Sequence, residues 1–336
     1  MRGIAIIFIV LHNLLHLFLE TTENEFIFSI ARSNTFAKHA LEFTPYFYKD
    51  IFSFLGWYGV AVFLFLSGYG LTQKYGFTTE QPFKAGSFVW KHLKRVFLLM
   101  LIPYTLFAIR HLLRGQYLQI FLQLTLTSNI FNPNGISPGV FWFFGLIAQF
   151  YIFFAIIRKS NSIYGIGGGI LLIINILSLI IIVYPRWSYE LMNYVRHNFI
   201  GWLLPFSAGI WFAECKSMNS LFDSYWKNGL WVIVCGALVT ISNYNFYAWC
   251  ISPIFAIMAS IGLTKVLARY RWINESCIWL GTLSSFLFAV HPTVRLLCMR
   301  YFANEMTHTI YILGYLLASI AVAIAYRAIH KRFLSK

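Results

Sequence analysis

The stretch RGIAIIFIVLHNLLHLFL, residues 2–19, sets the class of this protein. It is apolar over almost the length that an α-helix needs to cross a bilayer, which is about 20 residues. A basic residue opens it, as in a signal peptide, but no small-residue cleavage site follows, because the chain continues into bulky and acidic residues. We therefore expect this stretch to be a permanent membrane span.

The composition of the whole chain agrees with that interpretation. Of the 336 residues, 59% are hydrophobic, 11% are charged and 19% are aromatic. Soluble domains carry about 25% charged residues, so an ordinary soluble enzyme, a disordered chain and a disulfide scaffold are all excluded. The aromatic residues suit helix ends that lie at lipid–water boundaries.

Apolar runs of similar length predict an all-α, polytopic integral membrane protein with about ten transmembrane helices. They lie near residues 2–19, 52–73, 93–113, 141–157, 164–184, 199–214, 229–243, 246–267, 277–299 and 309–329. No Ser-, Pro- or Gly-rich linker divides the chain, so residues 1–336 are expected to form a single transmembrane domain with no appended soluble domain. The longest polar segment, residues 20–50, is expected on the external side.

The net charge of +15 follows from membrane topology rather than from a nucleic-acid partner. With ten spans, the larger share of the 26 Lys and Arg residues falls on the side that holds both chain termini. Both termini are therefore expected in the cytoplasm. The five cysteines form no CxxC pair, which favours buried thiols and no metal.

Two histidines within the first span are the first candidates for chemistry. His12 lies ten residues after Arg2, about 15 Å along a helix and near the middle of the hydrocarbon layer. His16 follows on the same helix face. A buried imidazole can simply hydrogen-bond a neighbouring helix, but two on one face favour proton transfer.

A basic cluster precedes the third span, in FVWKHLKRVFLLMLIPY, residues 88–104. Its spacing of three and four residues brings Lys91, Lys94 and Arg95 together on a helix beside His92, a good geometry for phosphate groups. Taken alone, such a cluster is more often a topology signal or a lipid contact.

Three further segments supply polar residues within or beside spans. They are GWYGVAVFLFLSGYGLT (56–72), VFWFFGLIAQFYIF (140–153) and FLFAVHPTVR (286–295). The resulting pocket candidates are Ser67, Tyr69, Trp142, Gln149, Tyr151 and His291. Taken alone, the first segment is better explained by helix packing at its glycines, whereas the proline after the last histidine opens the helix around it.

Taken in order, these segments resemble the acyltransferase-3 family. The similar features are RGIAI…H near the start, GV…F..LSGY in the second span, basic residues before IPY, WF…QFY in the fourth span and a late F…HP. Members are bacterial inner-membrane O-acyltransferases of the cell envelope that modify surface polysaccharides and other extracytoplasmic acceptors. The resemblance extends from Arg2 to about Arg295.

The resemblance implies that acyl-CoA, usually acetyl-CoA, is the donor co-substrate and that a hydroxyl of a glycan or lipid-linked sugar is O-acetylated. It makes Arg2 and His12 the signature pair, with His92 and Arg95 at positions that contact the donor. The family usually places its histidine eleven residues after the basic residue, whereas His12 comes at ten, about 80° away on a regular helix. We expect His12 to be the base, with Arg2 preceding the regular helix, and His16 as rival or partner.

Two other classes of function remain open from the residues alone. A proton-coupled transporter or flippase of a polysaccharide precursor also places ionisable groups and broken helices in the membrane. A non-catalytic membrane scaffold leaves the intramembrane histidines unexplained. Binding of acetyl-CoA separates the enzyme from the flippase.

Overall fold

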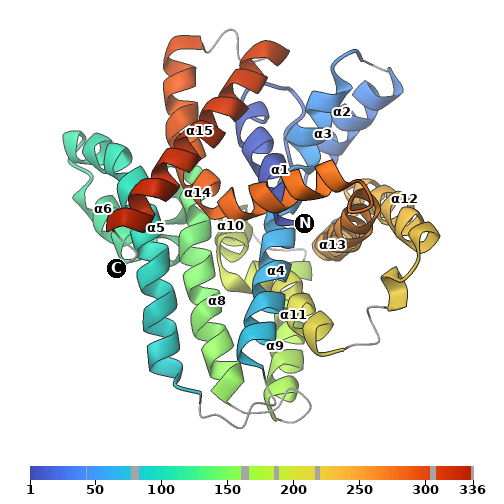
Figure 1. Ribbon diagram of the computed structural model, residues 1–336, viewed down its shortest axis with the longest axis horizontal. Coiled ribbons are helices and arrows are strands. Elements are labelled where there is room, and N and C mark those ends of the chain that lie inside the picture. The colour runs from blue at the N-terminus through green and yellow to red at the C-terminus, as the bar shows by residue number, and fades with distance from the viewer. Residues whose placement is uncertain are drawn as a thin grey trace.

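The computed structural model describes residues 1–42, 44–76, 83–159, 166–184, 189–215, 220–302 and 308–333, and this part of the chain is helical without a strand (Figure 1). The helices are α1 (Arg2–Leu15), α2 (Ile30–Leu41), α3 (Phe47–Leu55), α4 (Tyr58–Tyr75), α5 (Ala85–Leu113), α6 (Tyr117–Leu124), α7 (Ser128–Phe131), α8 (Trp142–Lys159), α9 (Ile166–Val183), α10 (Tyr189–His197), α11 (Phe199–Glu214), α12 (Tyr225–Ser242), α13 (Phe246–Leu267), α14 (Arg271–Phe302) and α15 (Thr309–Phe333). Two short 3₁₀ turns, Pro133–Gly135 and Gly139–Phe141, precede α8.

The expected all-α membrane class is confirmed, whereas the expected number of spans is not. Within the described residues, five helices are long and apolar enough to cross a membrane, and α3 with α4 forms a sixth candidate that is bent by 48°. Helix α1 and the apolar part of α9, Gly168–Val183, are shorter than a span requires, and α11 has 16 residues. About ten spans therefore stays a prediction. Residues 164 and 165 of the fifth expected run lie outside the described residues.

The bend between α3 and α4 has a local cause. The expected second span, residues 52–73, is divided near Gly56, where the backbone packs directly against α1. A Cβ atom at Gly56 would lie 2.5 Å from the Cβ of His12 and 2.7 Å from the carbonyl oxygen of Phe8. Only glycine permits this approach, and the chain changes direction where it occurs.

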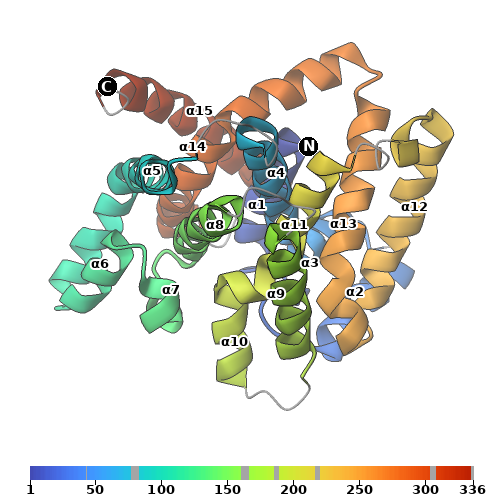
Figure 2. The same ribbon diagram turned by 90° about the horizontal axis from the view of Figure 1, so that it is seen from below.

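Helix α1 lies among the other helices rather than at the edge (Figures 1 and 2). It packs against α3, α4 and α14, and its buried residues are mostly aliphatic. The chain that follows α1 also turns inward: Thr21 and Asn24 are fully buried and Glu25 is 7% exposed. The polar segment expected as an external loop thus begins with residues 20–29, which pack beside α1 with Thr21, Asn24 and Glu25 buried and are called the buried strap below.

Candidate active site

His12 is held in one orientation by the backbone of α3. It is 3% exposed, and its Nδ1 lies 2.9 Å from the carbonyl oxygen of Ser53. Because a carbonyl only accepts, Nδ1 carries the proton in this bond and the lone pair of neutral His12 is on Nε2. A general base needs such a fixed, unprotonated nitrogen.

His16 repeats the arrangement one turn later. Its Nδ1 lies 2.7 Å from the carbonyl oxygen of His12, and the two rings stack with centroids 4.9 Å apart. Each Nδ1 is thus committed to a backbone carbonyl, which leaves the lone pair on Nε2 in the neutral form of both rings. The structure brings together the two expected imidazoles, as the i, i+4 spacing predicts.

Two glutamates of the buried strap complete this histidine cluster, and the sequence analysis did not select either. The Oε2 atom of Glu25 lies 3.9 Å from Nε2 of His12. Burial raises the pKa of the Glu25 carboxyl, while the nearby histidine opposes that shift. Burial also acts to raise the pKa of Glu23, but the charges of His12 and His16 outweigh it and leave that pKa lowered. The sequence feature that could have indicated these glutamates is the run ENE, residues 23–25, which follows closely after a span with two histidines.

His12, His16 and Glu23 are also the types of residue that bind metals. Their ligand atoms lie within 4.8 Å of one another. Two zinc-bound nitrogens are only about 3.4 Å apart at a tetrahedral ion, so these side chains would have to close in around a cation. The expectation of no metal stays a prediction.

A cavity of about 290 Å³ lies at the other end of α1. It brings together Arg2 of α1, Ser67 of α4 and Tyr151 of α8, three of the expected site residues. Hydroxyl side chains of α14 that the sequence analysis did not select also line it; they are Thr282, Ser284 and Ser285. Most of the remaining lining is apolar, so the cavity is an apolar space between helices with a group of hydroxyls and a guanidinium at its edge; it is called the polar cavity below.

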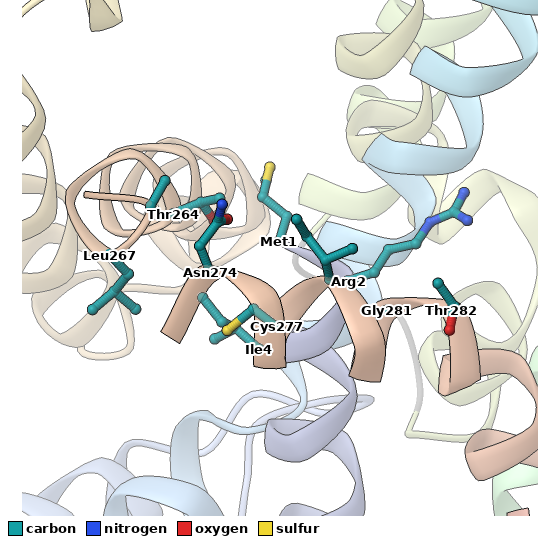
Figure 3. A pocket seen from close by; sticks show the side chains of 11 residues that line it. Met1, Arg2, Ile4, Thr264, Leu267, Asn274, Cys277, Gly281 and Thr282 are labelled. Atoms are coloured by element: carbon teal, nitrogen blue, oxygen red, sulfur yellow. The ribbon is translucent and has the colours of Figure 1, made fainter. Parts of the chain in front are cut away.

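An adjoining pocket of about 370 Å³ shares Arg2, Gly281 and Thr282 with this cavity. Figure 3 shows the Arg2 side chain pointing away from Thr264 and Asn274, on the side where Thr282 lies. The guanidinium thus extends toward the polar cavity.

Arg2 and His12 do not meet. Helix α1 begins at Arg2, with the amide of Ala5 bonded to the carbonyl of Met1, so the expectation that Arg2 precedes the regular helix is wrong. The ten-residue offset then directs the two side chains to different neighbours and separates them by about 15 Å along the axis. Arg2 lines the polar cavity, whereas His12 faces α3 and the buried strap.

The residues of the basic cluster before the third expected span lie on the first turns of α5, where some are exposed and one is buried. Lys91, Lys94 and Arg95 are exposed, whereas His92 is buried. The Nε2 of His92 lies 3.1 Å from the hydroxyl of Tyr75, and its ring lies 4.5 Å from that of Tyr151. The three cations are open to a ligand, and His92 connects their helix with the polar cavity through Tyr151.

The amide of Gln149 holds the start of α11. It donates to the side-chain oxygen of Asn198 over 2.8 Å and accepts from the backbone of Phe199 over 2.9 Å. Trp142 is 5% exposed and stacks on Trp202, with centroids 5.6 Å apart. Both side chains fix the position of α11 relative to α8.

The remaining pocket candidates are spread over the molecule. Tyr69 packs near the rings of Phe65 and Phe212 on the α11 side of α4. His291 is fully buried, and its Nδ1 lies 3.2 Å from the carbonyl of Leu287 in the preceding turn. These two residues join neither the histidine cluster nor the lining of the polar cavity.

Comparison with known proteins identifies the family. The family model described as an acyltransferase domain, acyltransferase 3, matches residues 1–328. No curated protein and no solved structure matches this chain. Since the family model covers almost the whole chain, which also has the apolar helices of a membrane protein, the resemblance found in the sequence is confirmed. This chain belongs to the acyltransferase-3 family, whose membership implies acyltransferase activity.

Proposed function

We propose that this protein transfers an acyl group, most often acetyl, from acyl-CoA on the cytoplasmic side of the inner membrane to a hydroxyl of an extracytoplasmic glycan or lipid-linked sugar. The observation that carries the proposal is the fixed imidazole of His12, in a chain of an acyltransferase family. Its Nδ1 is committed to the Ser53 carbonyl, so Nε2 is the atom that takes the proton of the acceptor hydroxyl.

The donor enters from the other end of α1. The exposed cations Lys91, Lys94 and Arg95 bind the phosphates of CoA, because clustered cations on one helix suit phosphate oxygens. The polar cavity beside Arg2 and Tyr151 accommodates part of the thioester arm. Ile9, which lies one turn before His12 on α1, also lines this cavity, so the cavity extends along the helix toward the base.

The reaction needs a base only when the acceptor hydroxyl loses its proton. The acceptor O–H gives its proton to Nε2 of His12 as its oxygen forms a bond with the thioester carbonyl carbon. The C–S bond then breaks, and the imidazolium returns the proton to the leaving thiolate, so that an O-acyl ester and free CoA result. A positioned general base of this kind contributes about 10²–10⁴-fold in rate.

The test uses membranes that contain the protein together with acetyl-CoA labelled in its acetyl group. Base-labile label in envelope glycan and release of free CoA thiol are both measured. We expect the wild-type protein to give both signals and His12→Gln to lower them by at least about 10²-fold. His111→Gln is the matched control, since His111 is also a buried histidine of a long helix, bonded at Nδ1 to Gln116 over 2.7 Å. Full activity in His12→Gln overturns the assignment of the base, and a wild-type protein that does not bind acetyl-CoA overturns the proposed function in favour of a flippase.

A further inference from the structure

A fully buried arginine holds the strap that carries Glu25. Arg196, at the end of α10, is 1% exposed and donates to the carbonyl oxygen of Glu25 from Nε over 3.0 Å and from Nη2 over 2.9 Å. Its Nη1 donates to the carbonyl of Gly201 over 3.3 Å. A buried cation is costly, and all three of these bonds go to backbone rather than to a carboxylate, so its position needs an explanation.

Three tryptophans, from the turn between α3 and α4, from α11 and from α13, surround this guanidinium. Its central carbon lies 4.6 Å from the ring of Trp249, 4.8 Å from that of Trp202 and 5.7 Å from that of Trp57. Such rings stabilise a cation over their faces. The indole of Trp249 also donates to the carbonyl of Asn24 over 2.7 Å, so the cage binds the strap directly.

The main chain of the strap is therefore fixed at two successive residues, because the carbonyls of Asn24 and Glu25 each accept from a buried donor. With its main chain held in this way, the Glu25 side chain extends to His12. The same cluster contains further charged or titratable groups on each neighbouring element. These are His16 directly after α1, Glu23 on the strap, Arg295 on α14, which bonds the carbonyl of Asn13, and Arg32 on α2, which bonds the carbonyl of Glu23.

Nε2 of His12 and Oε2 of Glu25 lie 3.9 Å apart, so an acceptor hydroxyl that reaches Nε2 comes close to the carboxylate. An acceptor oxygen about 2.8 Å from Nε2 is at a normal hydrogen-bond distance, and because its single proton goes to Nε2 it makes no hydrogen bond to the ionised carboxylate. An acceptor hydroxyl in that place donates to Nε2, and the carboxylate is next to the positive charge that forms on the ring. In serine hydrolases the carboxylate that stabilises the imidazolium bonds Nδ1, the nitrogen away from the reacting oxygen, whereas Glu25 acts through its charge from the Nε2 side.

We propose that Glu25 is a catalytic residue that stabilises the imidazolium formed at His12 beside the reacting oxygen, and that Arg196 in its tryptophan cage is the positioning residue for Glu25. This inference rests on the proposed function. The carboxylate keeps its charge throughout: the proton moves from the acceptor hydroxyl to His12 and then to the CoA thiolate, as described above. Arg196 acts only through the backbone that it holds.

The decisive variant is Glu25→Gln, which keeps the shape of the side chain and removes its charge. We expect kcat to fall by about 10²-fold, with the KM for acetyl-CoA unchanged within about twofold. The acid limb of the rate–pH profile should move to lower pH, because the imidazolium loses its neighbouring negative charge. Glu20→Gln, in the same segment but exposed, is the matched control and should leave both the rate and the profile unchanged.

Arg196 is tested by a double-variant cycle. Arg196→Met should also lower kcat, and the double variant Arg196→Met, Glu25→Gln should be no slower than Glu25→Gln alone, since Arg196 acts through Glu25. If Arg196→Met does not fold, Arg196→Lys replaces it in the cycle; it keeps the charge but loses the two-atom contact with the Glu25 carbonyl.

The outcomes separate this inference from the proposed function. Wild-type kcat and an unmoved pH profile in Glu25→Gln overturn the role of Glu25. Losses that multiply in the double variant overturn the positioning role of Arg196. Absence of transfer by the wild-type protein is a failure of the proposed function instead, and it is visible before any variant is compared.

Discussion

The carbonyl oxygen of Ser53 lies 2.9 Å from Nδ1 of His12, so the last turn of α3 determines which ring nitrogen of the histidine is free. Ser53 itself is anchored, because its hydroxyl donates to the carbonyl of Thr21 over 2.5 Å. His12, the end of α3 and the buried strap are therefore one connected unit. A substitution in any of the three should be felt at the other two.

The close contact at Gly56 should be intolerant of any side chain. We expect Gly56→Ala to lower the free energy of unfolding by about 1–3 kcal/mol, because its Cβ meets His12 and the backbone of Phe8. Activity should fall as well, since Ser53 lies only one turn away. Gly70→Ala in α4 is the control: nothing lies within 4 Å of its Cβ, so it should be neutral or slightly stabilising. Thermal unfolding in detergent measures both, and equal melting temperatures would falsify this account of the bend.

His12 and His16 should differ in their effect on rate. His12 has both the Ser53 carbonyl and the Glu25 carboxylate next to its nitrogens, whereas Nδ1 of His16 bonds only the carbonyl of the preceding turn. We expect His12→Ala to abolish O-acetylation and His16→Ala to reduce it by less than about tenfold. The reverse order, with His12→Ala the more active variant, would make His16 the base.

The exposed cations of α5 should affect donor binding and not chemistry. Replacing Lys94 and Arg95 by alanine is expected to raise the KM for acetyl-CoA by about tenfold and leave kcat nearly unchanged, which is the behaviour of uniform binding. The effect should shrink at high salt because exposed charges are screened. Lys227→Ala removes an exposed lysine that pairs with Asp223 elsewhere, and it should not alter KM. A lower kcat with constant KM in the α5 variant contradicts the donor site.

The buried carboxyl of Glu25 should lower the free energy of unfolding at neutral pH. Burial raises the pKa of its carboxyl in the folded state. The folded protein therefore holds this proton more tightly than the unfolded chain does, so the contribution of Glu25 to stability is lost as pH rises from the unfolded value toward the folded one. We expect Glu25→Gln, which titrates no proton, to melt no lower than wild type at pH 7 and to gain relative to it as the pH rises above the ordinary pKa of a glutamate, about 4.3. A lower melting temperature in Glu25→Gln at pH 7 contradicts this sign.

Metal removal should leave the activity unchanged. The ligand atoms of His12, His16 and Glu23 are spread over as much as 4.8 Å, wider than a bound zinc ion requires. Transfer should proceed at the same rate after treatment with EDTA. A loss that added Zn²⁺ restores would show that the histidine cluster is a metal centre and not an acid–base pair.

The sequence predicted the helical membrane class and the pairing of His12 with His16, because both depend on local periodicity. It did not predict the division of residues 52–73 into two helices, since that depends on where α1 approaches Gly56. It predicted three residues of the polar cavity, Arg2, Ser67 and Tyr151, but not their assembly.

The residues that the sequence analysis missed are those brought in by long-range contacts. Glu25 looked like part of an external polar segment, but it is buried beside His12, and Arg196, far along the chain, bonds its backbone carbonyl. Gln149 looked like a pocket residue, but its amide is used to start α11. Polar residues in apolar segments indicate that a partner exists, while the identity of the partner depends on tertiary packing.

The tryptophan cage has a consequence for the order of biosynthesis. Asn24 and Glu25 precede Trp249 and Arg196 by 225 and 171 positions in the chain. The opening helix with its histidines is made first, yet the carboxylate beside them has no fixed place until α10 and the start of α13 have left the ribosome. A prematurely terminated polypeptide thus carries the imidazoles without their finished surroundings, and the enzyme gains its competence only near the end of its own synthesis.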